Sequence, residues 1–386
     1  MTERLTLRDL VTALLGPTAG AALGEVPPVP VVRAVVDSRA AVPGSLFVAL
    51  RGERHDGHEF IPHAVEQGAV AVIADRADVP RLRALGCATV DVAAGSGWGT
   101  ADLSPPVCIV VPDSLAALQQ VAAFWRRRRD VRVVGITGSI GKTMTKEITA
   151  SVLGRRYATL RSEGNYNNEI GLPLTLLHLA GDHERVVLEM GMYDVGEITA
   201  LARIALPQVG VVTNVGPSHL ERLGTIERIA LAKTELPQAL PPAAEGGVAI
   251  LNADDDRVRA MAAATRARVV TYGLSADADV RATAVTSEGL EGIRFQLHYA
   301  GDTLHVRVPL LGRHSVHTAL AAAAVGLVDG LDWTEIVEGL HEQGTSGGVQ
   351  LRLAAVPGPA GSTILDDTYN ASPASTTAAL TLLDDL

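Results

Sequence analysis

The chain has 386 residues, of which 47% are hydrophobic and only 3% aromatic, and its formal net charge at pH 7 is −10. This length predicts two or three domains, and cores rich in Ala, Val, Leu and Ile suit α/β layers. The acidic balance argues against nucleic-acid partners, which require a basic face. Two cysteines provide neither a disulfide framework nor a metal site. We therefore expect a cytoplasmic protein, with no membrane insertion because no apolar run is long enough to cross a bilayer.

Residues 1–105 are expected to form a small α/β domain. Its strand candidates are residues 31–36, 46–50 and 69–74, with a helix over 61–68. A polar turn of Asp37, Ser38 and Arg39 follows the first strand, and polar loops at strand ends commonly contact ligands. Three histidines nearby have no carboxylate or cysteine at a standard metal-binding spacing, which argues against a metal site. The composition leaves a binding surface and ordinary solvated loops equally open.

Strand-like and helix-like blocks alternate from about residue 106 to 310, after a stretch rich in Gly, Ser and Pro. The predicted strands cover residues 107–111, 131–136, 186–189 and 209–214, and the predicted helices cover 113–129, 143–154 and 196–204. This alternation predicts a parallel sheet with helices on both faces, in which ligands bind beyond the carboxyl ends of the strands. Four consecutive arginines, residues 126–129, end the first helix, where we expect a solvated cationic terminus that complements the helix dipole.

The segment VVGITGSIGKTMTKE, residues 133–147, has the order strand, glycine turn, Lys-Thr and helix that builds a phosphate-binding loop. Backbone N–H groups of the turn would approach the phosphates. The turn residues concerned are Gly138, Ser139 and Gly141. Lys142 would reach the β/γ-phosphates, and the Thr143 hydroxyl would bind Mg²⁺. The loop departs from the general pattern G-x-x-x-x-G-K-[ST], because Ile136 occupies the first glycine position.

Polar residues follow the next predicted strands. Glu189 ends the apolar run 186–188, and Asn214 and His219 follow the strand after it. A carboxylate facing the phosphate loop could hold Mg²⁺ directly or through water, and a salt bridge is the alternative interpretation. We expect His219 to belong to the nucleotide site. Lys233 lies among small apolar residues of a helical block, where a lysine normally extends its ammonium group to solvent.

An asparagine-rich segment, GNYNNEIG, precedes an apolar helix pattern. Its neutral amides suit recognition of a polar substrate, and capping of the helix by Asn167 or Asn168 is the competing interpretation. Residues 268–310 predict a strand-rich subdomain. A third block follows at 311–386, and it contains fewer strands than a doubly wound domain needs. We therefore expect this third domain to be incomplete.

Together these motifs resemble the Mur ligase family. The similar segments follow one another from about residue 35 onward: GITGSIGKTMTKE, GNYNNEIG, EMGMYDVGEI, TNVGPSHLERLG, AKTEL, LNADD, GRHSVHTALAAAAV and DDTYNASPAS. The resemblance implies an α/β architecture of three domains. These are an N-terminal UDP-substrate-binding domain (1–105), a central P-loop parallel-sheet ATPase domain (106–310) and a truncated C-terminal Rossmann-like domain (311–386).

The resemblance is greatest to the branch that joins D-Ala-D-Ala to a UDP-muramoyl-tripeptide in peptidoglycan precursor synthesis. In that reaction ATP converts a peptide carboxylate into an acyl phosphate, and an amine then displaces phosphate to form the amide. The resemblance implies ATP and two Mg²⁺ ions as cofactors, the two small molecules as partners, and a monomer.

The family's functional residues can be placed on matching positions of this sequence. Lys142, His219 and Lys233 match catalytic positions, with Lys233 at the position of a lysine that is carbamylated to bind metal. Thr143, Glu189 and His219 match metal ligands, and Asn214 matches a contact to the adenine region. Asp37, Ser38 and Arg39 match the loop that binds the uridine substrate, and Asn165 and Asn168 match the muramoyl-peptide loop. Arg313 and Asp367 match positions near the γ-phosphate and ribose.

Two alternatives remain open at this stage. The chain could be a truncated or degenerate homologue that binds nucleotide or UDP-substrate without turnover, because Ser315 and Thr318 replace asparagines that the family usually has. It could also be a sister Mur ligase that adds a different amine.

Overall fold

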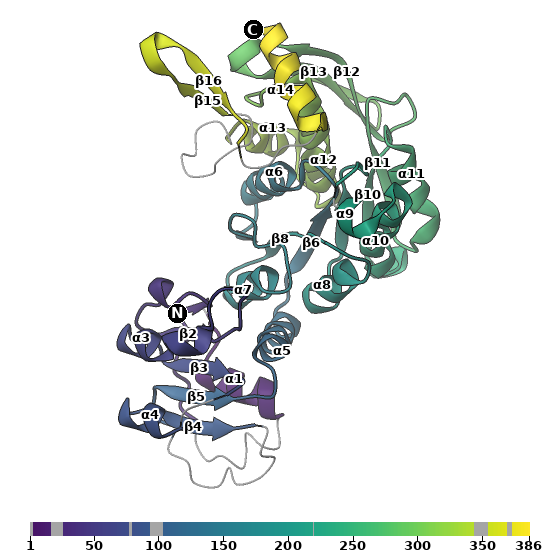
Figure 1. Cartoon of the computed structure of the whole chain (residues 1–386). Coiled ribbons are helices and arrows are strands. Elements are labelled where there is room, and N and C mark those ends of the chain that lie inside the picture. The colour runs from purple at the N-terminus through teal and green to yellow at the C-terminus, as the bar shows by residue number, and fades with distance from the viewer. Residues whose placement is uncertain are drawn as a thin grey trace. The chain divides into compact units, whose positions relative to one another are not determined.

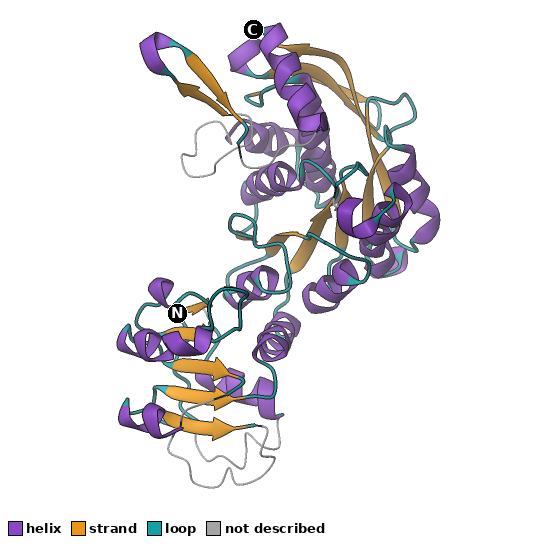
Figure 2. Cartoon of the chain, viewed as in Figure 1, coloured by secondary structure: helices purple, strands orange, loops and turns teal. Residues whose placement is uncertain are grey.

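The computed structural model describes residues 3–16, 26–76, 79–92, 103–218, 220–342, 354–368 and 373–386 (Figures 1 and 2). The chain divides into two compact units. The first comprises Met1–Asp130 and Glu169–His183, and the second comprises Val131–Asn168 and Glu184–Leu386. The chain thus leaves the first unit, returns to it for one short segment, and leaves it again.

The first unit contains a parallel five-stranded sheet with the order β1-β2-β3-β5-β4. Its strands are β1 (Arg33–Val35), β2 (Ser45–Val48), β3 (Ala71–Ala74), β4 (Ala88–Asp91) and β5 (Val107–Val110). Its helices are α1 (Leu7–Leu15), α3 (Ile61–Glu66), α4 (Val79–Ala84), α5 (Ser114–Arg127) and α7 (Gly171–Leu177). We expected residues 107–111 to begin the central sheet. They lie in this sheet instead, because β5 pairs with both β3 and β4.

The arginine cluster at the end of α5 is only partly solvated, so the expected solvated terminus is wrong for two of its residues. Arg126 is 4% exposed and Arg129 is 8% exposed. The Arg129 guanidinium lies 3.7 Å from the centroid of the Trp125 ring, and its Nη1 lies 3.0 Å from Glu3 Oε2. The aromatic face and the carboxylate replace part of the water around this buried cation, and its Nε and Nη2 have no hydrogen-bond partner among the described residues.

The second unit contains a nine-stranded sheet with the order β14-β13-β12-β11-β10-β9-β6-β8-β7. Its strands are β6 (Arg132–Thr137), β7 (Thr159–Arg161), β8 (Arg185–Glu189), β9 (Val209–Val212), β10 (Val248–Asn252), β11 (Arg268–Gly273), β12 (Val280–Ser287), β13 (Ile293–Tyr299) and β14 (Asp302–Val308). Neighbouring strands from β7 to β12 pair in parallel, and β13 and β14 are antiparallel. The predicted parallel sheet is confirmed. The strand-rich region 268–310 extends this sheet.

The helices of the second unit are α6 (Lys142–Gly154), α8 (Glu197–Ala205), α9 (Leu220–Leu223), α10 (Ile226–Ala239), α11 (Asp256–Ala260), α12 (Val316–Val328), α13 (Trp333–Glu342) and α14 (Pro373–Asp385). A hairpin of β15 (Ala354–Pro357) and β16 (Thr363–Asp366) precedes α14. The predicted bounds of α6 and α8 are thus reproduced to within one residue.

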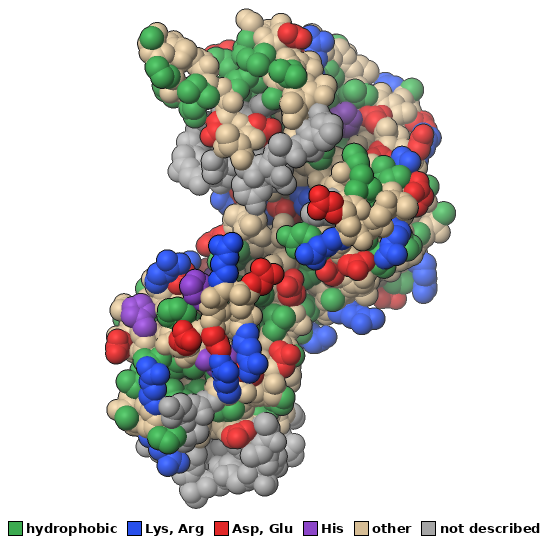
Figure 3. Space-filling model, viewed as in Figure 1, with side chains coloured by type: hydrophobic (Ala, Val, Ile, Leu, Met, Phe, Trp, Pro, Cys, Tyr) green, Lys and Arg blue, Asp and Glu red, His purple; other side chains and the backbone are tan. Residues whose placement is uncertain are grey.

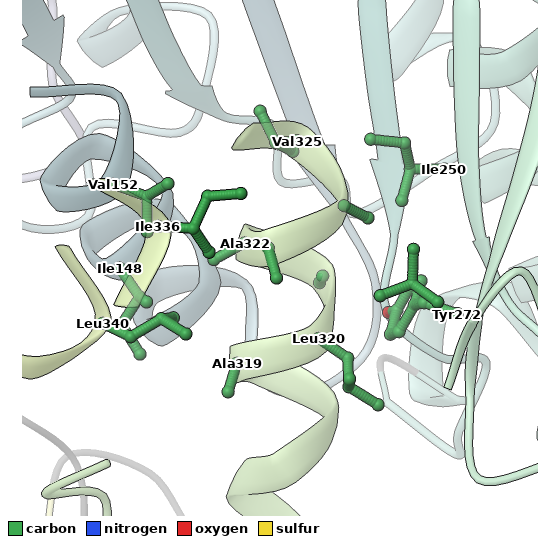
Figure 4. Packing of buried hydrophobic residues seen from close by; sticks show 14 of the residues in the cluster. Ile148, Val152, Ile250, Tyr272, Ala319, Leu320, Ala322, Val325, Ile336 and Leu340 are labelled. Carbon is green, nitrogen blue, oxygen red and sulfur yellow. The ribbon is translucent and has the colours of Figure 1, made fainter. Parts of the chain in front are cut away.

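Helix α12 lies in the middle of the core of this unit. Figure 4 shows Ala322 and Val325 of α12 beside Val152 of α6 and Ile336 of α13, with strand residues such as Ile250 on its other side. We expected residues from 311 onward to belong to a third domain, but α12 and α13 contribute to the core of the second unit. Because α12 is apolar around its whole circumference, it needs apolar partners on two sides, and the sheet and the pair α6–α13 provide them.

Acidic and basic side chains are interspersed over the face of the molecule seen in Figure 3. Among the described residues, no helix is both long enough and apolar enough to cross a membrane.

Candidate active site

The phosphate loop connects β6 to α6 at the carboxyl ends of the neighbouring strands β9, β6 and β8. Gly138 and Gly141 have φ angles of +150° and +83°, which side chains of L-residues rarely allow. A Cβ atom on Gly138 would lie 1.9 Å from Thr213 Oγ1. Glycine is therefore required where the loop packs against the end of β9. The predicted order of strand, turn and helix is confirmed.

The loop is held in shape by residues that follow β9. The amide of Asn214 contacts both backbone groups of Ile140: Ile140 N donates to Asn214 Oδ1 at 2.9 Å, and Asn214 Nδ2 donates to Ile140 O at 3.0 Å. The hydroxyl of Ser139 donates to Gly216 O at 3.0 Å and accepts from Gly216 N at 2.9 Å. Asn214 and Ser139 therefore both fix the conformation of the loop.

Lys142 and Thr143 form the first turn of α6. Lys142 Nζ lies 2.9 Å from Gly138 O and 3.4 Å from Ser139 O, so the ammonium group extends back over the loop. A phosphate in the loop would offer it anionic acceptors in place of two neutral carbonyls, and charge-assisted hydrogen bonds are stronger. The helix N-terminus contributes further positive potential at this point.

Glu189 brings a buried carboxylate to the same strand edge, where its side chain meets Thr143. The residue is 2% exposed. Its Oε2 accepts a hydrogen bond of 2.8 Å from Thr143 Oγ1, and its Oε1 accepts one of 2.8 Å from Asn167 Nδ2. Both donors are neutral, and in the part of the chain that the structure describes no lysine, arginine or histidine pairs with this carboxylate. A buried charge without a counter-charge is costly, so the carboxylate and the adjacent hydroxyl fit a bound Mg²⁺.

Lys233 is also buried, at 2% exposure, on the face of α10 that carries Ile229 and Leu236. Burial, together with the charge of Lys142, lowers the pKa of the Lys233 amine well below its usual value. Within the described residues no hydrogen bond or ion pair is made by its amine. The expectation of a solvent-extended lysine is wrong here. The spacing of the sequence could have predicted this burial, because position 233 falls between the apolar positions 229 and 236 on one face of the helix.

Comparison with known proteins agrees with this geometry. The Mur ligase middle domain matches residues 136–326, and the catalytic domain of the Mur ligase family matches residues 34–96. The chain is 37% identical over 353 residues to the UDP-N-acetylmuramoyl-tripeptide–D-alanyl-D-alanine ligase of Bacillus subtilis, and the match covers 91% of this chain and 69% of that protein. The chain belongs to the Mur ligase family.

Two solved structures of Mur ligases resemble the chain over nearly all of its length. MurF from Acinetobacter baumannii matches with a TM-score of 0.80 at 32% identity. The match covers 100% of this chain and 77% of the Acinetobacter chain. MurF from Thermotoga maritima, solved in complex with ADP, matches with a TM-score of 0.73 at 28% identity, covering 92% of this chain and 75% of its own. The family and the branch predicted from the motifs are thereby confirmed.

A second polar cluster of this Mur ligase lies around Asp254, for which the sequence motifs predicted no role. Its carboxylate accepts hydrogen bonds from Leu274 N at 2.7 Å and Ser275 N at 2.8 Å, and it lies 2.7 Å from His317 Nε2. Although burial raises the pKa of Asp254, these donors more than offset it and hold the pKa below its usual value. The neighbouring Asp255 accepts from Val215 N at 2.8 Å. The segment LNADD therefore orders the loops that follow β9 and β11.

Arg313 and Asp367, predicted near the γ-phosphate and ribose, lie in the C-terminal part of the second unit. Arg313 belongs to a 3₁₀ turn before α12, and its Nη2 lies 3.0 Å from Asp385 Oδ1 of α14. Burial and the charge of His317 lower the pKa of His314, and the nearby carboxylate of Asp367 opposes this. The turn and α14 line an open pocket of about 470 Å³. Its lining residues are Gly312, Arg313, His314, Thr377, Ala378, Thr381 and Leu382.

The predicted substrate residues lie on two separate segments. In the first unit, Asp37 accepts hydrogen bonds from the guanidinium and the backbone N of Arg39, which lower the pKa of this carboxyl. Ser38 Oγ lies 3.0 Å from His63 Nδ1. In the second unit, Asn165 is exposed and Asn168 half-buried in the segment before α7.

Capping of α7 by Asn167 or Asn168 is wrong, because the N-cap of this helix is Ile170 and it has no side-chain cap. His219, the predicted ligand of a second metal ion, lies outside the described residues.

Proposed function

We propose that the chain is an ATP-dependent, ADP-forming ligase that joins D-alanyl-D-alanine to a UDP-N-acetylmuramoyl-tripeptide. The observation that carries this proposal is the phosphate loop with Lys142, Thr143 and Glu189 around it, in a chain that is 37% identical to such a ligase. We also propose that it acts as a cytoplasmic monomer in peptidoglycan precursor synthesis.

The reaction takes place in two steps. In the first, a carboxylate oxygen of the tripeptide attacks the γ-phosphorus of ATP, the bond to the β,γ-bridging oxygen breaks, and ADP leaves. In the second, the amino nitrogen of D-alanyl-D-alanine attacks the acyl carbon, phosphate leaves with the former carboxylate oxygen, and the nitrogen loses a proton. Lys142 and the N-terminus of α6 offset the negative charge that gathers between carboxylate and phosphate.

Thr143 and Glu189 would hold a Mg²⁺ ion, and His219 and Lys233 would hold a second one. When bound, Mg²⁺ supplies positive charge to the phosphate oxygens. The side chains of Thr143 and Glu189 meet at hydrogen-bond distance, which supports their assignment as two oxygen ligands of one ion.

Lys233 serves this site as a carbamate. Its buried amine loses its proton more readily than an ordinary lysine, and only a neutral amine is nucleophilic. The nitrogen lone pair attacks the carbon of CO₂, the nitrogen releases one proton, and the product carries a carboxylate-like group. This change converts a neutral amine into an anionic group that can bind metal.

The remaining residues recognise the substrates. Asp37, Ser38 and Arg39 bind the uridine part of the UDP-substrate, and Asn165 and Asn168 bind the muramoyl-peptide. Asn214 contacts the adenine region, and Arg313 and Asp367 contact the γ-phosphate and ribose.

A coupled assay for ADP release tests the proposed function. ADP should form when ATP, Mg²⁺, UDP-N-acetylmuramoyl-tripeptide and D-alanyl-D-alanine are all present, and the amide product should appear by mass spectrometry in equal amount. Diaminopimelate or lysine in place of D-alanyl-D-alanine should give no product. ADP release that is indifferent to both substrates, or a product formed equally well with the other amines, would overturn the proposal.

A further inference from the structure

Asn167 ties the segment between β7 and α7 to the metal-binding carboxylate. Its side-chain Nδ2 donates to Glu189 Oε1 at 2.8 Å, and its backbone O accepts from Gly191 N at 2.8 Å. A Cβ atom on Gly191 would lie only 3.0 Å from Asn167 Cγ, so the amide rests directly on the backbone that follows Glu189. Asn167 is therefore attached to this strand end through both its backbone and its side chain.

Lys146 fastens the start of the same segment to α6. It lies one helical turn after Lys142 and is 0% exposed. Its Nζ donates to Ser162 O at 2.7 Å and to Gly164 O at 3.0 Å, and it pairs with Glu147 Oε1 at 2.8 Å. All three N–H donors of this buried ammonium group therefore have a partner, which is what makes a buried charge tolerable.

These hydrogen bonds connect α6, the end of β8 and the asparagine-rich segment in a ring. It begins on α6 at Thr143, passes through Glu189 and Asn167 into the asparagine-rich segment, and returns to α6 through Lys146. The Asn167 amide occupies Glu189 Oε1, so that Oε2 stays directed at the Thr143 hydroxyl. Outer partners of this kind fix the orientation of a metal ligand, and losing one typically lowers metal affinity by about 10- to 100-fold.

We propose that Asn167 and Lys146 are positioning residues that hold the Glu189 carboxylate for Mg²⁺ and couple it to the segment that carries Asn165 and Asn168. The proposal rests on the proposed function for the identity of the ligands. It assigns to Asn167 a role different from helix capping and from direct contact with the substrate.

The test measures metal binding directly, by the electron paramagnetic resonance signal of free Mn²⁺ in the presence of ADP. Asn167→Ala should weaken Mn²⁺ affinity by about 10- to 100-fold. Tyr166→Ala, which removes an exposed side chain from the same segment, is the matched control and should leave this affinity unchanged. In the ligation assay, Asn167→Ala should require more Mg²⁺, and excess Mg²⁺ should restore most of its kcat.

Lys146→Met should show the same loss of Mn²⁺ affinity, and Lys146→Arg, which keeps the charge and the donors, should recover part of it. Because Lys146→Met can fail to fold, the Mn²⁺ affinity of Asn167→Ala decides whether these residues position Glu189. A folded Asn167→Ala protein with wild-type Mn²⁺ affinity would overturn this inference even if ligation occurs. A wild-type chain that binds Mn²⁺ with ADP but forms no amide would overturn the proposed function and leave this inference standing.

Discussion

Thr143 Oγ1 donates a hydrogen bond of 2.8 Å to Glu189 Oε2, although the two residues are 46 positions apart in the sequence. Their strands explain the contact. β6 and β8 are neighbours and run in parallel, so that Ile136 pairs with Glu189 and the chain beyond β6 turns over the end of β8. The hydroxyl of the phosphate loop and the buried carboxylate therefore meet at one strand edge, where ligands of parallel sheets bind.

Glu189→Gln should abolish most of the activity while keeping the fold. The substitution removes the charge that we assign to Mg²⁺ and keeps the size of the side chain. We expect ADP release to fall by about 100-fold or more. The melting temperature should not decrease greatly, since the carboxylate has no cationic partner among the described residues. Near wild-type activity of Glu189→Gln would contradict the metal assignment.

Lys233 should bind CO₂. In buffer containing ¹³C-bicarbonate, the wild-type chain should show a carbamate carbon signal in the NMR spectrum that disappears in Lys233→Arg, because a guanidinium stays protonated and cannot add CO₂. Ligation by Lys233→Arg should fall by about 100-fold or more, because a bound metal ion supplies several kcal/mol of charge stabilisation. An identical signal in both proteins would show that the carbamate lies elsewhere.

Asp254→Asn should lower stability in a pH-dependent manner. The pKa of Asp254 is held below its unfolded value of about 3.9, so its contribution to stability is present above that value and lost as the pH falls through the folded pKa. We expect the variant to be about 1–3 kcal/mol less stable at pH 6, with a smaller difference at pH 3. Urea denaturation at both pH values measures this. If wild type and Asp254→Asn differ in unfolding free energy by the same amount at pH 3 and pH 6, the ionised carboxylate does not stabilise the fold.

The packing of α13 against α6 should not tolerate a methyl group at Gly339. A Cβ atom there would lie 2.5 Å from Val152 Cα, so the helices must separate. Gly339→Ala should cost about 1–3 kcal/mol of unfolding free energy.

Gly154→Ala is the matched control for this helix pair. Gly154 is the last residue of α6, and apart from its chain neighbours and the adjacent backbone of its own helix no described atom lies within 4 Å of its Cβ position. Gly154→Ala should leave the free energy of unfolding unchanged or raise it by up to about 1 kcal/mol. Thermal unfolding compares the two variants, and equal melting temperatures would show that α13 is not packed as described.

Local pattern was sufficient to predict the phosphate loop, since Val133 to Glu147 carries strand, turn and helix signals within one short segment. It was also sufficient to predict that Glu189 lies near the loop, because the carboxyl ends of parallel strands lie at the same edge of the sheet. The role of Asn167 was not predictable, because its contact with Glu189 depends on the path of an irregular segment. The place of α12 was not predictable from periodicity either, because a helix that is apolar on all sides does not reveal which neighbours it will pack against.

Activation of the tripeptide carboxylate as an acyl phosphate transfers one of its oxygen atoms to the released phosphate. UDP-N-acetylmuramoyl-tripeptide labelled with ¹⁸O in its terminal carboxylate should be incubated with the chain, ATP, Mg²⁺ and D-alanyl-D-alanine, and the released phosphate analysed by mass spectrometry. We predict one ¹⁸O atom in each phosphate, with one amide formed per ADP. Phosphate without ¹⁸O, formed alongside ADP, would contradict the proposed reaction.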